Sequence, residues 1–253
     1  MRAVVLAITV SFALVACGGH KTASPTLLAV SKSADKTTAV GSEHVQFSGY
    51  VVAAGQTVTL SGDGDFQQSP QVGRASLRIS GGPLDTSVDE VIKGWTIYVR
   101  SPLFGSILPA GARWASMDLE KLGSKYGVDL GQLSQVSPTD TLAALKEAGS
   151  VTNLGAATIK GVPTTHYQAV VDLGKVPGGK ALAKEAHLSA VPVDVWIDKQ
   201  GLTRRLVLSE TIDANGQSAA TRITMDLSRF GEAVHVTVPS AGDTFDLTSL
   251  AGS

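Results

Sequence analysis

Alternation of apolar with polar or small residues recurs along most of this chain, and it limits the folds that the chain can adopt. Ile97 and Val99 alternate with Tyr98 and Arg100, and runs of the same kind continue as far as Val234–Val238. A period of two indicates a β-strand with one apolar face. Repeated over roughly ten strands, mostly joined as an antiparallel meander, the pattern predicts a strongly curved sheet whose apolar face must be covered.

Helical segments are few. Ser24 followed by Pro25 is typical of an N-cap and first helical residue, and predicts a helix from Pro25 to about Val40. Further short helices are predicted over Ser137–Gly149 and Pro177–Leu188. The predicted fold class is α+β, with a strongly curved antiparallel sheet and a few helices to cover its apolar face; the family resemblance given below implies that this sheet is an open half-barrel with the helices covering its concave face. Because these helices are short and weakly apolar, they leave room for a ligand cavity, unless loops or closure of the sheet cover the same area.

The charge balance excludes several classes of partner. The chain has 21 basic and 22 acidic residues and a formal net charge of −1. A nucleic-acid-binding protein needs a concentrated basic face, and attachment to a membrane through a polybasic surface needs one too. We therefore expect no nucleic-acid partner. No Pro- or Ser-rich linker divides the chain, so residues 25–253 are predicted to form a single domain.

The N-terminus has the pattern of an export signal. Arg2 precedes an uncharged apolar run over residues 3–16, which is shorter than the roughly 20 residues that a membrane-spanning helix needs. The run ends in Leu14-Val15-Ala16-Cys17, which resembles the bacterial lipobox. The resemblance implies cleavage between Ala16 and Cys17, so residues 1–16 are the signal peptide. It also implies a diacylglyceryl group on the Cys17 thiol.

Cys17 is the only cysteine in the chain. The alternative interpretation is an ordinary secretory peptide with an incidental cysteine, but an unpaired thiol is usually avoided in an oxidising compartment. Two acyl chains would anchor the protein stably to the extracytoplasmic face of the cell membrane. Residues 17–24 are then the lipidated cysteine and a short polar tether.

Motifs of enzymes and metal sites are absent from the sequence. There is no Gly-x-Ser-x-Gly elbow, no His-Glu-x-x-His and no phosphate-binding glycine loop. The five histidines are scattered without the spacing of metal ligands. Asp63-Gly64-Asp65 clusters hard oxygens but lacks the later ligands of a calcium loop. The sequence does not decide whether carboxylate pairs form in space among the acidic residues Asp85, Asp89, Glu90, Asp194 and Asp198. We expect no catalysis, no metal and no cofactor.

Two segments carry a family resemblance. They are KGVPTTHY over Lys160–Tyr167 and VWIDKQGLTRRL over Val195–Leu206. With the lipobox, the leading helix and the order of strands, they make the chain similar to the actinobacterial LppX/LprG-type lipoproteins. That family shares its fold with the LolA lipoprotein carriers and the RseB sensor domain. The resemblance implies a half-open barrel with helices across its mouth, and in some members a lipid or lipoglycan between sheet and helices.

On this model a set of apolar strand residues forms the concave face and lines the cavity, although each of them could instead pack in a closed core. The set comprises Leu60, Leu77, Ile79, Trp95, Ile97, Val99, Tyr167, Val193, Val195, Leu206, Leu208, Ile223 and Met225. Ser137–Gly149 and the apolar loop Leu103–Ala110 are candidate elements of the mouth.

Two functions remain open. The first is a membrane-anchored protein that binds or carries a lipid in the cavity by burying its acyl chains. The second is an envelope sensor or protein-interaction lipoprotein of the same fold, with a filled core and an envelope protein as its partner. A lipid extracted from the purified protein would distinguish the first from the second.

Overall fold

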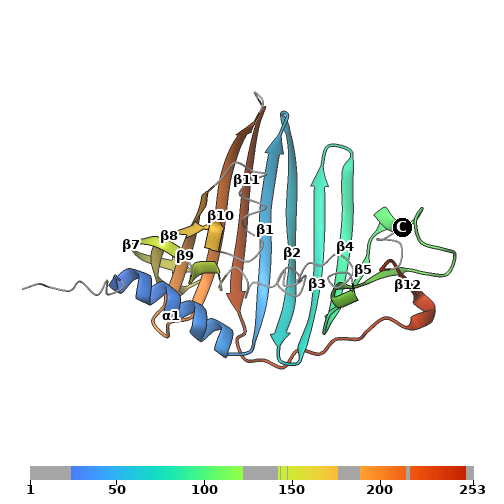
Figure 1. Ribbon diagram of the computed structural model, residues 1–253, viewed down its shortest axis with the longest axis horizontal. Coiled ribbons are helices and arrows are strands. Elements are labelled where there is room, and N and C mark those ends of the chain that lie inside the picture. The colour runs from blue at the N-terminus through green and yellow to red at the C-terminus, as the bar shows by residue number, and fades with distance from the viewer. Residues whose placement is uncertain are drawn as a thin grey trace, which may run out of the picture.

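The computed structural model describes residues 24–121, 142, 144–146, 148–175, 189–214 and 217–248. The strands with their bounds are β1 (Ser42–Ala53), β2 (Gln56–Gln68), β3 (Gln71–Gly81), β4 (Leu84–Lys93), β5 (Thr96–Arg100), β6 (Trp114–Asp118), β7 (Ala148–Ile159), β8 (Val162–Asp172), β9 (Ala190–Asp198), β10 (Thr203–Ala214), β11 (Gln217–Ser228) and β12 (Thr244–Asp246). In these parts of the chain they form one curved sheet in the order β12-β6-β5-β4-β3-β2-β1-β11-β10-β9-β8-β7 (Figure 1). The chain is mostly β, and the sheet is open because its two edges, β12 and β7, do not pair.

Two antiparallel meanders build the sheet. β1 to β6 form one, β7 to β11 form the other, and they join where β1 pairs with β11. The described strands number 12, which corrects the prediction of roughly ten. The additional β12 is only three residues long and pairs parallel with β6.

Strand β4 is not marked by a clear alternation. Leu84, Thr86, Val88, Glu90 and Ile92 share one face of the strand, as the register with β3 shows. Two of these five positions are polar, and they interrupt the apolar series on which recognition of a strand depends. The strand forms because its backbone pairs with β3 along its whole length.

The C-terminal segment 229–243 is a strap and not a strand. Its alternating valines predict a strand, but it runs along the ends of β1 to β5 to reach the far edge of the sheet (Figure 1). At its start the Gly231 amide donates to the Ser42 carbonyl at 3.0 Å, and at its end the Arg113 amide donates to the Asp243 carbonyl at 2.9 Å. The strap therefore ties the end of β11 to the edge that contains β6.

Helix α1 (Pro25–Ala39) begins as predicted, with the Ser24 side chain accepting from the Leu27 amide at 3.2 Å. It packs against β7 to β10. We call the face of the sheet that α1 covers the inner face and the opposite one the outer face. The buried stripe of the helix differs from the expected apolar one, because it includes Ser33 and Thr37.

Those two hydroxyls fix α1 to the start of β10. Ser33 Oγ lies 2.8 Å from Thr203 Oγ1, and the Thr203 amide donates to Thr37 Oγ1 at 2.9 Å. Both contacts are buried, so each polar atom is satisfied where it would otherwise be costly. Val30 and Ala34 complete the stripe and belong to the buried core.

Glycine on the inner face of β2 permits a close approach of β3. A Cβ atom at Gly62 would lie 2.1 Å from the Ser76 carbonyl oxygen and 2.9 Å from Leu77 Cδ2. No side chain fits at that distance, so only glycine allows the strands to bend around the inner face here.

Most of the other predicted helices lie outside the described residues. Leu142 and Leu145, from the segment predicted as a helix over Ser137–Gly149, are fully buried in the core. The predicted end of that helix at Gly149 is wrong, because β7 already begins at Ala148. Among the described segments, no helix combines the length and apolar character that crossing a membrane requires.

Candidate functional site

All but one of the predicted cavity residues lie on the inner face. Residues that pair directly in an antiparallel sheet project to the same side. One row pairs Leu77 with Gly62, Gly62 with Phe47, and Phe47 with Met225, and it continues to Leu206, Val195 and Tyr167. A second row holds Ile79, Leu60, Ile223, Leu208 and Val193. Ile97 and Val99 of β5 extend the same face.

Trp95 is the exception. It lies in the turn between β4 and β5, is 38% exposed, and its carbonyl accepts from the Leu119 amide at 3.0 Å. The alternation of residues predicted Trp95 as part of the same strand as Ile97. That prediction is wrong by one residue, because the strand begins at Thr96.

The predicted cavity residues differ in burial according to their strand. Val193, Val195, Leu206 and Met225 are buried in the core, in the part of the sheet around β9 to β11. Ile97, Tyr167, Leu208 and Ile223 are partly buried and pack against that core. Leu60, Leu77, Ile79 and Val99 are only partly buried, and they lie on β2, β3 and β5.

The inner face therefore has two halves. Over β7 to β10, α1 covers it and the apolar side chains are packed. Over β2 to β5 the apolar surface continues. Phe66, Ala75 and Ile92 on these strands still belong to the buried core. Val88, which pairs with Leu77, and its apolar neighbours on β2, β3 and β5 retain contact with solvent. We call this second half, formed by Leu60, Leu77, Ile79, Val88 and Val99, the open half.

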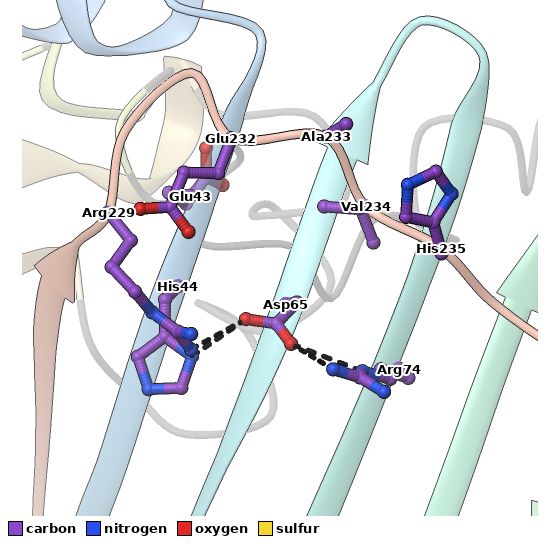
Figure 2. Close-up of a pocket in the computed structure, with 9 residues that line it drawn as sticks. All are labelled: Glu43, His44, Asp65, Arg74, Arg229, Glu232, Ala233, Val234 and His235. Carbon is purple, nitrogen blue, oxygen red and sulfur yellow. Dashed lines mark hydrogen bonds and ion pairs between the residues drawn. The ribbon is translucent and has the colours of Figure 1, made fainter.

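A polar pocket of about 170 Å³ lies where the strap crosses the strand ends (Figure 2). Figure 2 shows Asp65 between His44 and Arg229 on one side and Arg74 on the other. Asp65 Oδ1 accepts from His44 Nδ1 at 2.8 Å and from Arg229 Nη2 at 2.9 Å, and Oδ2 accepts from Arg74 Nη2 at 2.8 Å. Arg229 also contacts the His44 ring nitrogen. Arg229, at the start of the strap, has a φ of 47°.

The electrostatics of this pocket are those of a structural cluster. Burial opposes ionisation of Asp65, but hydrogen bonds from Arg74 and His44 and the charge of Arg229 outweigh it and hold its pKa below the usual value. None of the described residues that line the pocket is a serine, threonine or cysteine. Within the described residues no three His, Cys, Asp or Glu side chains are grouped as metal ligands. The contacts of Asp65 with Arg229, His44 and Arg74 fasten the start of the strap to β1, β2 and β3.

Asp63 and Asp65, which lack the later ligands of a calcium loop, belong to a strand, and the aspartates whose pairing the sequence left open pair with cationic or histidine side chains. Asp63 and Asp65 lie within β2 on the outer face, and Asp65 is occupied by the cations named above. Asp85, Asp89, Asp194 and Asp198 each pair with a cationic or histidine side chain instead of with one another. Asp89 and Glu90 face opposite sides of β4.

A second hollow of about 480 Å³ lies beside β2, β3 and β4 near Pro102. Its lining is mostly polar and includes Ser61, Asp63 and Arg78. Leu77 is the one predicted cavity residue that lines either hollow. Most of the apolar surface of the open half therefore lies outside these two hollows.

The loop after β5 exposes large apolar side chains. Leu103 is 54% exposed and Ile107 57% exposed. The loop is ordered by its own backbone, because the Ile107 amide donates to the Phe104 carbonyl at 2.9 Å and the short helix η1 (Pro102–Phe104) is capped by Ser101. Its side chains are therefore held in solvent by a fixed turn.

Comparison with known proteins agrees with this description of the fold. No family model matches the chain. An uncharacterised 31.2 kDa protein of Streptomyces griseus, encoded between rplA and rplJ, is 26% identical over 151 residues. That match covers 54% of this chain and 48% of the relative, so the chain spans about half the length of this curated protein.

Two solved structures are similar over most of their length. LppX of Mycobacterium tuberculosis superposes with a TM-score of 0.54 at 20% identity, covering 84% of this chain and 98% of that one. LprF of Mycobacterium bovis superposes with a TM-score of 0.53 at 15% identity, covering 85% and 97%. LppX is described as a lipoprotein. The sequence resemblance is confirmed at the level of the fold, and this chain has the fold of the LppX/LprG-type lipoproteins.

Proposed function

We propose that this protein is an envelope lipoprotein, anchored through a diacylglyceryl group on Cys17, that binds the acyl chains of a lipid on the open half of its inner face. The observation that carries the proposal is the apolar inner face itself. It extends from the packed core under α1, across Phe47 of β1, to Leu60, Leu77 and Ile79, which are partly exposed. Binding requires no covalent step, and the protein acts as a carrier and not as an enzyme.

The energetics favour an apolar ligand there. Apolar surface gains about 25 cal/mol for each Å² that is removed from water. A contiguous apolar surface that remains in solvent marks an interaction site more often than single exposed side chains do. The outer face of the same strands offers no such surface, because Asp65, Arg74, Asp89 and Arg100 form ion pairs across it.

The cargo is tested with a soluble protein that begins at Gly18. This protein contains every element of the described fold, and it lacks the lipid that Cys17 itself would carry. It is purified from bacteria without detergent, extracted with organic solvent and examined by mass spectrometry. A stoichiometric lipid is expected. An empty extract, with no saturable uptake of a fluorescent acyl probe, would contradict the proposal and favour the protein-interaction lipoprotein.

A pair of matched variants localises the site. Leu77→Gln places a polar side chain of similar size on the open half, and Ser87→Gln places the same side chain on the outer face of β4. We expect the first to weaken binding of the acyl probe about tenfold and the second to leave it unchanged. Equal thermal unfolding of the two variants shows that the difference is one of binding.

The anchor has its own test. Cells that produce the full chain are labelled with a radioactive fatty acid, and the membrane fraction is collected. We expect label on the wild type and none on Cys17→Ala, which should leave the membrane fraction. Label that persists in the variant would show that the lipobox interpretation is wrong.

A further inference from the structure

Two carboxyl side chains face the apolar inner face. Glu90 of β4 pairs with Ala75 on one side and with Val99 on the other, and both of these share its face. Glu210 of β10 pairs with Thr221, on the face that also holds Leu208. A polar residue at such a position needs a partner, because an isolated carboxylate loses its hydration there.

Neither carboxyl has a partner among the residues that the structure describes. Within the described residues, no hydrogen bond or ion pair reaches Glu90 or Glu210, and Oε1 of Glu210 is fully shielded from solvent. Burial alone raises the pKa of both groups. The acids of the outer face differ sharply: Asp89 accepts from Arg100 at 2.8 Å, and Asp226 accepts from Arg205 at 2.8 Å.

Of the two, Glu90 is the one that adjoins the open half. Both side chains are partly exposed, but it is Glu90 that has Val88 and Val99 of the open half as its neighbours. An apolar residue at this position would continue the surface at lower cost, since it would need no partner. A carboxylate on an otherwise apolar surface is acceptor-only, so what it requires is a hydrogen-bond donor.

We propose that Glu90 selects the cargo by accepting a hydrogen bond from a hydroxyl or ammonium group next to the acyl chains of the lipid, while those chains lie on Leu60, Leu77 and Ile79. This inference rests on the proposed function and specifies the class of lipid. Anionic headgroups such as carboxylates and phosphates are disfavoured, because they would place a second negative charge beside Glu90 in a poorly hydrated site.

Three probes with one acyl chain test the selection. Oleyl alcohol, oleylamine and oleic acid differ only in the headgroup, and their binding to the protein beginning at Gly18 is measured at pH 7 by displacement of a fluorescent acyl probe. We expect the alcohol or the amine to bind at least about tenfold more tightly than the acid. A preference for the alcohol identifies a hydroxylated lipid, and a preference for the amine identifies a cationic one.

Variants assign the preference to the carboxyl. Glu90→Leu should abolish it, Glu90→Gln should keep binding of the alcohol while losing any preference for the amine, and Asp63→Leu on the outer face should change nothing. Equal binding of all three probes to the wild type, or a preference that survives in Glu90→Leu, would overturn the role of Glu90 while acyl binding stands. If none of the three probes binds, the proposed lipid site is itself wrong and the role of Glu90 falls with it.

Discussion

Asp89 and Glu90 are adjacent in the chain and experience opposite environments. Asp89 lies on the outer face of β4, where it accepts from Ser76 Oγ at 2.7 Å and from Arg100. The Ser76 hydrogen bond and the charge of Arg100 together lower its pKa against the opposing effect of burial. Glu90 lies on the inner face, where burial raises its pKa. One strand thus presents a compensated acid to solvent and an uncompensated one to the apolar surface.

The uncompensated acid makes the protein less stable at neutral pH. A carboxyl whose pKa is raised in the folded state imposes no cost below the unfolded pKa, near 4.3, and its full cost above the folded pKa. We expect Glu90→Gln to raise the free energy of unfolding at pH 7 by about 1 kcal/mol. The gain should vanish below about pH 4, where wild-type Glu90 is protonated.

Urea unfolding of both proteins at the two pH values measures this effect. An equal gain at both pH values would mean that the charge of Glu90 is not its cause. A loss of stability at pH 7 would show that Glu90 has a stabilising partner. The combination of higher stability with lost lipid selectivity is what a functional residue at this position should produce.

The sequence predicted the repeated strands and the apolar face well, because a period of two depends only on local side-chain direction. It missed β4, and the reason is Glu90 together with Thr86, which interrupt the apolar series at inner positions. A local rule that fails at one position of a regular strand is often a sign of function. For the strap the error was the reverse, a strand predicted where none forms. Its valines alternate, but its backbone has no neighbouring strand to pair with.

Division of the inner face into a packed and an open half could not be predicted. Periodicity shows that Leu77 and Leu206 face the same side, and nothing in their spacing separates them. The difference comes from α1, which packs near Leu206 through contacts distant in sequence such as Ser33 with Thr203. Burial of this kind is a tertiary property and depends on which strands the helix reaches.

Asp65 should carry much of the stability of the strap. We expect Asp65→Asn to lower the free energy of unfolding at pH 7 by about 2 kcal/mol, because Arg74, Arg229 and His44 lose the negative charge and one of the two acceptor oxygens that they share. The pKa of Asp65 is lowered in the folded state, so its contribution is present above the unfolded value near 3.9 and is lost as the pH falls through the folded one.

The same substitution on a neighbouring aspartate is the control. Asp63 lies two residues away on the outer face of β2 and makes no ion pair with another described residue. Asp63→Asn should change stability by less than about 0.5 kcal/mol. The free energy of unfolding of both variants is measured by chemical denaturation at pH 7. A comparable loss of stability in both would show that negative charge on the strand in general is responsible, and not the Asp65 cluster.

Gly62 should tolerate no side chain. Its Cβ position is 2.1 Å from the Ser76 carbonyl oxygen, so Gly62→Ala forces β2 and β3 apart. We expect a loss of about 2 kcal/mol or more, measured by thermal unfolding. Gly55→Ala lies in the hairpin turn with open space around its Cβ but at a φ of 75°, and it separates backbone strain from steric contact. A smaller loss at Gly62 than at Gly55 would contradict the steric account.

The apolar loop should govern exchange with membranes. Leu103 and Ile107 are held in solvent by an ordered turn, and no charged residue lies between Arg100 and Arg113. Inserting each side chain into a bilayer surface contributes about 1 kcal/mol. We therefore expect the double variant Leu103→Ser/Ile107→Ser to slow transfer of a fluorescent lipid from vesicles to the protein by about tenfold.

Leu154 provides a matched control for the loop. It is 50% exposed on β7, at the opposite edge of the sheet from β5. Leu154→Ser removes a side chain of the same kind and should leave the transfer rate unchanged. Binding of a monomeric acyl probe should also stay unchanged in the loop variant, because the open half of the inner face is intact. Equal slowing in both variants would mean that exposed apolar area in general, and not this loop, meets the membrane.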